Sequence, residues 1–503
     1  MVRKVEEVDL YTLPTEAVPA EVKILDVEDY VLHYHLSSVT IGDATKIMLE
    51  NLKGILAREV EIEIKEVLDP RLFGETKAKF LKRAREKIHD LFPNLDPEDV
   101  KILASVVVGE TMELGVIEYL LADDNIEEIV VNQSNEPIWI YHKKYGWLKT
   151  NIVPPDENWI EEYSARIARQ VGREITALEP LLDAHLISGD RVNATLFPIS
   201  TRGNTITIRR FSRTPWTMSH MMQPKWKTIS AEASAFIWLA MEYEFSMLVA
   251  GGTGSGKTSL LNATMPFFPP NQRILTIEDT RELQLPEYSH WIPMTTRPPN
   301  PHGGGEISML DLMVNALRQR PDRIVVGEVR AKREAEIMFE AMHTGHSTYA
   351  SFHAERAIEV VDRITNPPMS IPGTVLGSLH LICVQYRNRR TGIRRTFEVV
   401  ELVKKPGGGI PDLNVVYQWD PNMDYVKAVN PSVRLKEELE EFVGMTEKEM
   451  NQNLSEKSMI LDWMLEHKVM DINDVGKIIA EYYRDNDTIL ELVNENKSPE
   501  ELL

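Results

Sequence analysis

The sequence has one cysteine in 503 residues, no long hydrophobic run and no signal-peptide core at its N-terminus. Because Cys383 has apolar neighbours, we expect a buried thiol on a strand. A single cysteine excludes a disulfide framework and a cysteine-rich zinc site. No apolar run approaches the ~18 residues that cross a membrane. We therefore expect a cytoplasmic protein unless a partner recruits it elsewhere.

The sequence also lacks an extended basic run, and its formal net charge is −21. An acidic surface repels phosphate, which argues against broad binding of DNA or RNA, so no nucleic-acid partner is expected. The best candidate for a local basic stripe is formed by Arg387, Arg389, Arg390, Arg394 and Arg395. We interpret it as a solvated hairpin between two strands.

What is present is an ordinary globular composition, with 43% hydrophobic and 26% charged residues and no internal repeat. A chain of this length predicts about two to four domains. Periodicity predicts six segments: an extended segment over residues 1–25, a mainly helical region over 26–122, a small α/β domain over 123–211, an inter-domain linker over 212–228, a core of alternating strands and helices over 229–420, and an acidic helical extension over 421–503.

Within the small α/β domain, residues 126–132, 137–141, 191–198 and 205–211 are predicted as strands, and residues 159–172 as a helix. Upstream, Asp96 followed by Pro97 indicates a helix start. The linker is rich in Met, Trp and Pro, and we expect it to pack against the domains that it joins.

The richest motif is Gly251 to Thr258, which fits G-x-x-x-x-G-K-[ST]. A buried strand is predicted before it and a helix after it, which is the context that a phosphate-binding P-loop requires. Lys257 is expected to reach the β- and γ-phosphates of ATP and Thr258 to hold Mg²⁺. The nucleotide-binding residues are Gly251, Gly252, Thr253, Gly254, Ser255, Gly256, Lys257, Thr258 and Ser259.

Two further strands are predicted to end in acids. Residues 273–280 deliver Glu278 and Asp279 to a loop, where they would support a metal ion or the attacking water. Residues 320–328 end in Gly327-Glu328, with glycine where many P-loop ATPases carry aspartate. Glu328 is therefore the candidate for both general base and metal ligand.

Histidines follow in the segment TGHSTYASFHA. His353 falls at the C-terminal end of a predicted strand, where an imidazole would meet the γ-phosphate. The role of His346 stays open. A zinc cluster of His343, His346 and His353 is a poor alternative, because no cysteine lies nearby and a glycine interrupts the helix.

Together, GGTGSGKTS, ILTIEDTRELQLP, LRQRPDRIVVGEVR and TGHSTYASFHA resemble the Walker A, Asp box, Walker B and His box of the secretion ATPase superfamily. Its members drive type II and type IV secretion, type IV pili and the archaellum. TRELQLP and the LRQRPD segment look like the archaeal branch. The absence of a four-cysteine zinc module distinguishes the chain from many bacterial type II members.

The resemblance implies an α/β fold: a RecA-like P-loop core, an N-terminal helical plus α/β (PAS-like) domain and a helical C-terminal extension. It implies a homo-hexamer that works on a polytopic membrane platform protein, with an accessory cytosolic regulator as a further candidate partner. It also makes Arg191, Arg209 and Arg210 candidate arginine fingers. The role of Arg320 stays open.

The resulting hypothesis is an ATPase motor that assembles or rotates a type IV pilus-like filament, with ATP and Mg²⁺ as ligands. Two alternatives remain open. One is a nucleic-acid motor, because RecA-like cores also drive helicases. The other is a regulator that changes shape with ATP or ADP without acting as a motor. The sequence does not distinguish archaellum, pilus and secretion machine.

Overall fold

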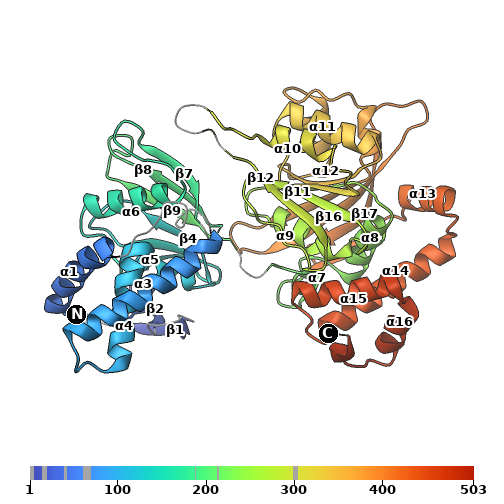
Figure 1. Cartoon of the computed structure of the whole chain (residues 1–503). Helices are drawn as coiled ribbons and strands as arrows, with labels where there is room; N and C mark the ends of the chain where they lie inside the picture. Colours follow the sequence, from blue (N-terminus) through green and yellow to red (C-terminus); the bar gives the residue numbers. More distant parts are fainter. Residues whose placement is uncertain are drawn as a thin grey trace. The chain divides into compact units, whose positions relative to one another are not determined.

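The structure is a computed structural model that describes residues 5–13, 20–38, 42–59, 70–186, 189–211, 215–297, 299 and 304–502. Contacts divide the chain into unit 1, Met1–Arg213, and unit 2, Thr214–Leu503. Figure 1 labels the elements of both units along the chain. The division falls at the start of the predicted linker, of which residues 212–214 lie outside the described residues. The finer domain boundaries stay predictions.

Unit 1 is built on a mixed sheet in which β3 and β6 pair in parallel and the other neighbours are antiparallel. In spatial order its described strands are β1 (Glu6–Leu13), β2 (Ala20–Asp26), β3 (His33–Ser37), β6 (Gly146–Thr150), β5 (Trp139–His142), β4 (Ile126–Val131), β9 (Thr205–Arg209), β8 (Arg191–Thr195) and β7 (Leu181–His185). Helices α5 (Val116–Ala122) and α6 (Glu157–Gln170) share its apolar core. The four strands and the helix predicted for this region are confirmed, and β6 and β7 are additional.

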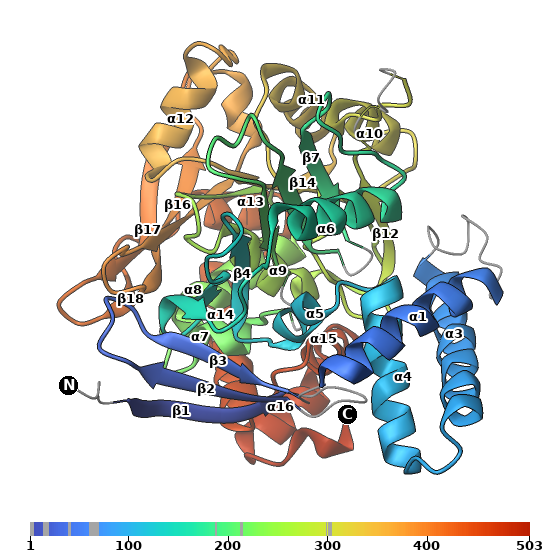
Figure 2. The same ribbon diagram turned by 90° about the vertical axis from the view of Figure 1, so that its left-hand side faces the viewer.

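A separate helical cluster follows β3 in unit 1. It consists of α1 (Asp43–Glu59), α3 (Pro70–Leu91) and α4 (Pro97–Met112), which pack around Leu52, Phe80 and Ala104. Figure 2 shows these helices beside one another, apart from the meander of β1, β2 and β3. As predicted, α4 begins after Asp96, whose carboxylate accepts a bond from the backbone N–H of Glu98.

The three N-terminal strands differ from the sequence prediction of an extended segment followed by helices. β2 buries Val22 and Ile24 and β3 buries Tyr34 and Leu36, whereas β1 is largely exposed. A strand as exposed as β1 lacks the clear apolar alternation that would predict it from the sequence. β3 pairs in antiparallel fashion with the nearby β2 and also in parallel with β6, more than a hundred residues later, and the second pairing leaves no local pattern in the sequence.

Unit 2 contains a sheet with a parallel and an antiparallel part. The parallel strands, in spatial order, are β12 (His290–Thr295), β11 (Arg273–Glu278), β13 (Arg323–Val326), β14 (Ser347–Phe352), β10 (Met247–Gly251) and β15 (Leu381–Arg387). The antiparallel strands β16 (Arg394–Val403), β17 (Asp412–Asp420) and β18 (Tyr425–Ala428) extend it from β15. The purely parallel sheet expected over residues 229–420 is thus completed by a meander that reaches Ala428.

Both faces of this sheet are covered, because alternate residues of β10 enter two apolar cores. Leu248 and Ala250 face the core formed with α10 (Met309–Ala316), α11 (Lys332–His343) and α12 (Ala357–Thr365). Met247 and Val249 face the core formed with α7 (Met218–Met222), α8 (Ala231–Glu242) and α9 (Lys257–Thr264). Figure 1 shows helices on both sides of the strands. The predicted α/β class with a RecA-like P-loop core is confirmed.

The C-terminal helices complete the second core rather than standing apart from it. They are α13 (Arg434–Val443), α14 (Glu447–Glu466), α15 (Ile472–Arg484) and α16 (Asn486–Asn494). Lys457 of α14 is fully buried and forms an ion pair of 2.8 Å with Glu242 of α8. The hydroxyl of Tyr483 accepts a bond of 2.8 Å from Trp238 Nε1 of α8. The helical character predicted for this region is confirmed.

The predicted linker also belongs to the fold of unit 2, because Met218, Met221 and Met222 of α7 are buried in the same core. Cys383 is buried on β15, as predicted, and burial raises the pKa of its thiol to about 12. Among the described helices, none is both long and apolar enough to cross a bilayer.

Candidate nucleotide site

The P-loop joins β10 to α9 and is shaped by two left-handed glycines. Gly254 has φ +68° and Gly256 has φ +96°, conformations that other residues adopt only with strain. Lys257 begins α9, and its Nζ donates to the backbone oxygens of Gly251 at 3.1 Å and Gly252 at 3.3 Å. The strand, loop and helix predicted from the motif are confirmed.

The predicted acidic and histidine residues meet at one edge of the sheet. Strands β11, β13, β14 and β10 are neighbours and parallel, so their carboxyl ends lie side by side. Glu278 ends β11, Glu328 follows β13, and His353 follows β14. In α/β folds this edge is the usual ligand site.

Glu278 is buried, and one of its carboxylate oxygens faces no donor. Its Oε1 accepts bonds from the backbone N–H groups of Glu282 at 2.9 Å and Leu283 at 3.0 Å. Its Oε2 accepts no hydrogen bond from any residue that the structure describes. Burial raises the pKa of Glu278 to about 7, although the two backbone N–H donors oppose the shift. A buried, unsatisfied carboxylate oxygen is a natural ligand for a metal-bound water.

The glycine at position 327 has a packing reason. A Cβ atom there would lie 3.3 Å from Cγ of Glu278, tighter than ordinary contact. Gly327 therefore makes room for the Glu278 side chain. The aspartate that many P-loop ATPases carry here would displace that side chain.

Glu328 and Asp279 are linked by an arginine that sequence reasoning missed. Arg330 donates from Nε to Glu328 Oε2 at 2.7 Å and from Nη1 to Asp279 Oδ2 at 2.7 Å. The Glu328 side chain is 23% exposed, so solvent reaches it. Arg330 orients both carboxylates. A divalent cation bound to Glu328 would have to share the Glu328 carboxylate with the Arg330 guanidinium. The signal for Arg330 was its place two residues after Glu328.

His353 contacts the P-loop, whereas His346 lies elsewhere. Nε2 of His353 is 3.2 Å from Oγ1 of Thr253. His346 precedes β14, at the opposite end of that strand, with Nδ1 3.1 Å from Oγ1 of Thr344. Within the described part of the chain, no three His, Cys, Asp or Glu side chains form a metal-binding group.

The three candidate arginine fingers occupy different environments in unit 1. Arg209 is exposed at the end of β9. Arg191 is half-exposed and forms a fork-to-fork ion pair with Asp183, with distances of 2.8 and 3.1 Å. Arg210 is buried, with a side chain 3% exposed that donates to the backbone oxygens of Asp123 and Ile126. Arg210 braces the interior of unit 1, which leaves Arg191 and Arg209 as the exposed candidates. Arg320 is exposed, with φ +53°.

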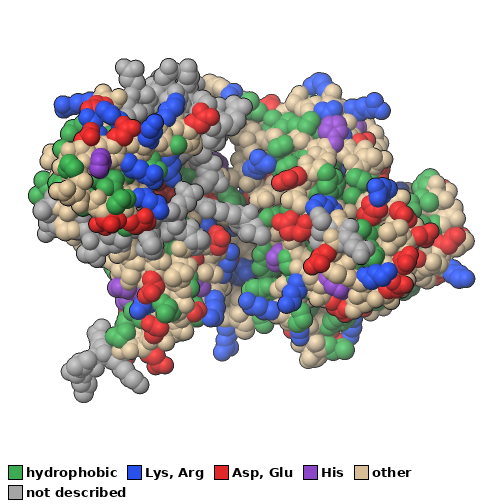
Figure 3. Space-filling model, turned by 60° about the horizontal axis from the view of Figure 1, so that its bottom comes forward, with side chains coloured by type: hydrophobic (Ala, Val, Ile, Leu, Met, Phe, Trp, Pro, Cys, Tyr) green, Lys and Arg blue, Asp and Glu red, His purple; other side chains and the backbone are tan. Residues whose placement is uncertain are grey.

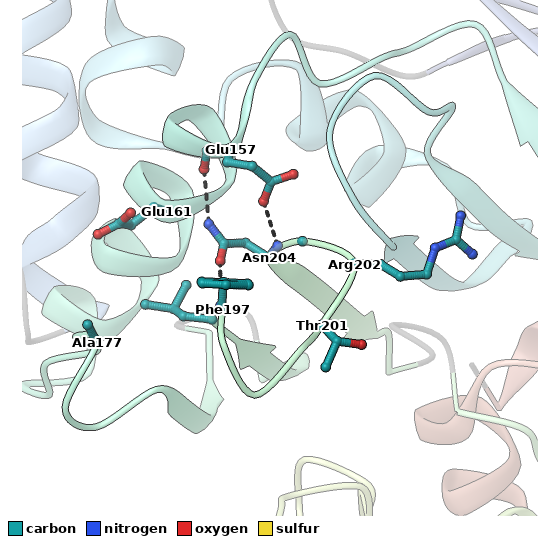
Figure 4. A pocket seen from close by; sticks show the side chains of 9 residues that line it. Glu157, Glu161, Ala177, Phe197, Thr201, Arg202 and Asn204 are labelled. Atoms are coloured by element: carbon teal, nitrogen blue, oxygen red, sulfur yellow. Dashed lines mark hydrogen bonds between the residues drawn. The ribbon is translucent and has the colours of Figure 1, made fainter.

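A pocket of about 380 Å³ in unit 1 is lined by residues of α6 and of the connection between β8 and β9 (Figure 4). The Glu157 carboxylate accepts bonds from the backbone N–H groups of Ser134 at 2.9 Å and Asn204 at 2.5 Å. Burial opposes ionisation, but these donors outweigh it and lower the pKa of Glu157. The Asn204 side chain accepts a bond from the backbone N–H of Phe197 at 2.8 Å and so closes the β8–β9 connection. We interpret these polar groups as structural.

The basic hairpin expected to be solvated meets the P-loop instead. Nε of Arg394 donates to the Gly254 backbone oxygen at 2.9 Å. A Cβ on Gly254 would lie 2.6 Å from Nη1 of Arg387. The prediction of a solvated hairpin is wrong for these two arginines and for Arg395, which is buried, and it holds for Arg389 and Arg390, which are exposed at the tip.

The residues present fit ATP and Mg²⁺. A Cβ on Gly251, Gly252 or Gly254 would approach neighbouring protein atoms to 3.1 Å or less, so glycine allows the close backbone turn that a phosphate cradle requires. The unsatisfied oxygen of Glu278 and the hydroxyl of Thr258 at the start of α9 are oxygen ligands of the kind that Mg²⁺ prefers.

The chain is similar to several known proteins. An uncharacterised protein of Methanocaldococcus jannaschii is 31% identical over 399 residues, covering 77% of this chain and 71% of that protein. The type IV secretion system protein PtlH of Bordetella pertussis is 28% identical, over 59% of this chain and 91% of PtlH. A crystal structure of the pilus retraction motor PilT with ADP aligns over 73% of this chain and 96% of PilT, at 17% identity and a TM-score of 0.42. That score is too low to support a conclusion.

The family description Type II/IV secretion system protein matches residues 110–390, a span that contains the P-loop, Glu278, Glu328 and His353. The match covers more than half of the 503 residues. The chain belongs to the type II/IV secretion system protein family.

Proposed function

We propose that this protein is an ATPase motor that acts as a homo-hexamer and assembles or rotates an archaeal type IV pilus-like filament through a polytopic membrane platform protein. One observation carries the ATPase assignment: a P-loop, a buried glutamate with an unsatisfied oxygen and a partly exposed glutamate converge at the edge of the parallel part of one sheet. Membership of the secretion family supports the link to a filament or secretion machine.

In this proposal, the P-loop and Lys257 bind the phosphates of ATP, and Thr258 and Glu328 hold Mg²⁺. Bound Mg²⁺ would neutralise charge on the phosphates. Glu328, oriented by Arg330, takes a proton from the water that attacks the γ-phosphate. Glu278 and Asp279 support that water. His353 reports the state of the phosphate through its contact with Thr253.

The arginines of unit 1 have a distinct part in the proposal. Arg191 and Arg209 stabilise the charge that develops on the transferred phosphoryl group in the state that hydrolyses ATP. If hydrolysis needs residues of both units, each round of ATP binding and hydrolysis would change the position of one unit relative to the other. Arg210 is left out, because its side chain is already bonded inside unit 1.

Two substitutions test the ATPase assignment. Lys257→Ala should abolish ATP binding and turnover. Glu328→Gln should keep ATP affinity but lower turnover by about 100-fold or more, since the base is lost while the cradle stays. Binding is measured with a fluorescent ATP analogue and turnover by phosphate release. If Glu328→Gln turns over ATP at the wild-type rate, Glu328 is not the base.

The motor assignment needs a separate experiment. The mass of the protein with a non-hydrolysable ATP analogue should be that of a hexamer, and hydrolysis should rise with a membrane fraction that contains the platform protein. Stimulation of hydrolysis by DNA or RNA instead would favour a nucleic-acid motor. On the face drawn in Figure 3, acidic and basic side chains are intermixed, which does not suggest a nucleic-acid binding surface there. Hydrolysis too slow to measure in an assembled oligomer would favour a regulator.

A further inference from the structure

The hairpin of β15 and β16, residues 381–403, packs against the P-loop at several positions of the loop. A Cβ on Gly251 would lie 2.6 Å from the backbone oxygen of Gln385, and one on Gly254 would lie 2.6 Å from Nη1 of Arg387. A Cβ on Gly256 would lie 3.8 Å from Cδ of Arg394. Each of these three P-loop glycines therefore faces one residue of the hairpin. The hairpin therefore packs directly against the P-loop backbone.

Arg394 fixes the orientation of one P-loop peptide. Its Nε donates to the Gly254 oxygen at 2.9 Å. Because a trans peptide is planar, holding this oxygen outward directs the N–H of Ser255 the opposite way. That N–H donates to the Gly252 oxygen at 3.3 Å, which closes a turn of the loop. A phosphate cradle requires backbone N–H groups directed inward, so the orientation of this peptide matters for phosphate binding.

Arg387 adds a second guanidinium at the same turn. Arginine stays charged at all physiological pH values, so Arg387 and Arg394 place two permanent positive charges beside the phosphate-binding loop. Unit 2 thus supplies its own arginines at the P-loop, in addition to any from unit 1.

The other face of β16 is anchored, which keeps the hairpin in place. Side chains at 394 and 395 point to opposite faces of the strand. Arg395 forms a bidentate ion pair with Asp424, at 2.7 and 2.8 Å, and donates to the Trp226 oxygen at 2.7 Å. The residue that contacts the P-loop is therefore adjacent to one bonded to residues 215–228, the segment that leads from unit 1.

We propose that Arg387 and Arg394 are positioning residues that hold the Gly254 turn of the P-loop in its phosphate-binding conformation. The inference rests on the proposed ATP binding. It extends that proposal by assigning a role in nucleotide affinity to a hairpin outside the four motif blocks.

The test compares Arg394→Ala and Arg387→Ala with Arg390→Ala, a control from the exposed tip of the same hairpin. Affinity for ATP and ADP is measured by titration, and kcat and KM by phosphate release. Arg394→Ala removes one charge-assisted hydrogen bond, and Arg387→Ala removes a positive charge beside the loop. Each should weaken affinity and raise KM about tenfold, while kcat changes by no more than about twofold. Arg390→Ala should stay within about twofold of wild type in every measurement.

Two further measurements separate positioning from simple destabilisation. Arg394→Lys should recover part of the lost affinity, because an ammonium can still donate to the Gly254 oxygen. The nucleotide-free Tm of Arg387→Ala should stay near that of wild type, while the Tm increase produced by ATP becomes smaller. The inference is overturned if both alanine variants bind ATP as wild type does, or lose affinity only in proportion to folded protein.

The outcomes also separate this inference from the proposed function. If wild-type protein does not bind ATP, the proposed function fails and the inference fails with it. If wild type binds ATP, Lys257→Ala does not, and Arg387→Ala and Arg394→Ala match wild type, only the role of the hairpin is wrong.

Discussion

Each unit carries two adjacent arginines at the end of a strand, Arg209–Arg210 in unit 1 and Arg394–Arg395 in unit 2, and both pairs divide in the same way. The second arginine of each pair is buried and bonded to backbone oxygens. The first arginine of the unit 1 pair, Arg209, is exposed. The first arginine of the unit 2 pair, Arg394, contacts the P-loop of its own unit. Strand alternation therefore separates a buried, structural arginine from one with a proposed functional role within two residues.

The acidic pair Glu278–Asp279 follows the same division. Glu278 is buried, whereas the Asp279 side chain is 43% exposed and pairs with Arg330. The difference between neighbours predicts that substitutions of buried members change stability and that those of exposed members change catalysis.

The largest effect is expected for Arg209→Ala. If Arg209 stabilises the transition state, turnover should fall by about 100-fold or more, while ATP affinity changes by no more than about threefold. Turnover is measured by phosphate release and affinity by titration. Arg202→Ala is the control, since Arg202 is exposed in the same unit and pairs with Glu136. An equal loss of affinity and turnover would make Arg209 a simple binding residue.

Arg210→Ala and Arg395→Ala should instead lower the free energy of unfolding by about 2–3 kcal/mol each, since several buried acceptors lose a charged donor. Activity per folded molecule of Arg210→Ala should stay near wild type. Urea unfolding gives the stability, and turnover is normalised to the folded fraction. A stable Arg210→Ala variant without turnover would return Arg210 to the set of arginine fingers.

Glu278 gives a pH prediction of intermediate size. Its pKa rises from 4.5 to about 7 on folding because of burial. The folded protein thus holds a proton that the unfolded chain releases, and the stabilisation is present below about pH 4.5 and lost as pH rises through about 7. Glu278→Gln should remove this loss and make the nucleotide-free protein about 1–2 kcal/mol more stable than wild type at pH 8.

The control for that prediction is Asp279→Asn, which alters the exposed neighbour and should leave the pH dependence of unfolding in place. Unfolding is followed from pH 5 to pH 8 without nucleotide. An unchanged pH dependence in Glu278→Gln would show that another group titrates.

These comparisons also show what could be read from the sequence. The P-loop, Glu278, Glu328 and His353 were predicted because each follows a short apolar run whose end is visible locally. The contacts of Arg387 and Arg394 with Gly254 were not, because they depend on β15 and β10 being neighbours. The division of Arg209 and Arg210 depends on which face of a strand is buried, and a shift of one residue in register would reverse it.

The smallest effect is expected for the ion pair of Arg191 with Asp183. Both side chains are about half exposed, at 49% and 51%, so solvent screens their attraction. Asp183→Asn should change the free energy of unfolding by less than about 0.5 kcal/mol, measured by urea unfolding, and leave turnover within about twofold of wild type. Asp424→Asn is the matched comparison, because its partner Arg395 is only 7% exposed, and it should cost clearly more stability. Equal costs at the two sites would mean that burial of the arginine does not set the strength of these pairs, and the distinction between exposed and buried arginines would lose its energetic basis.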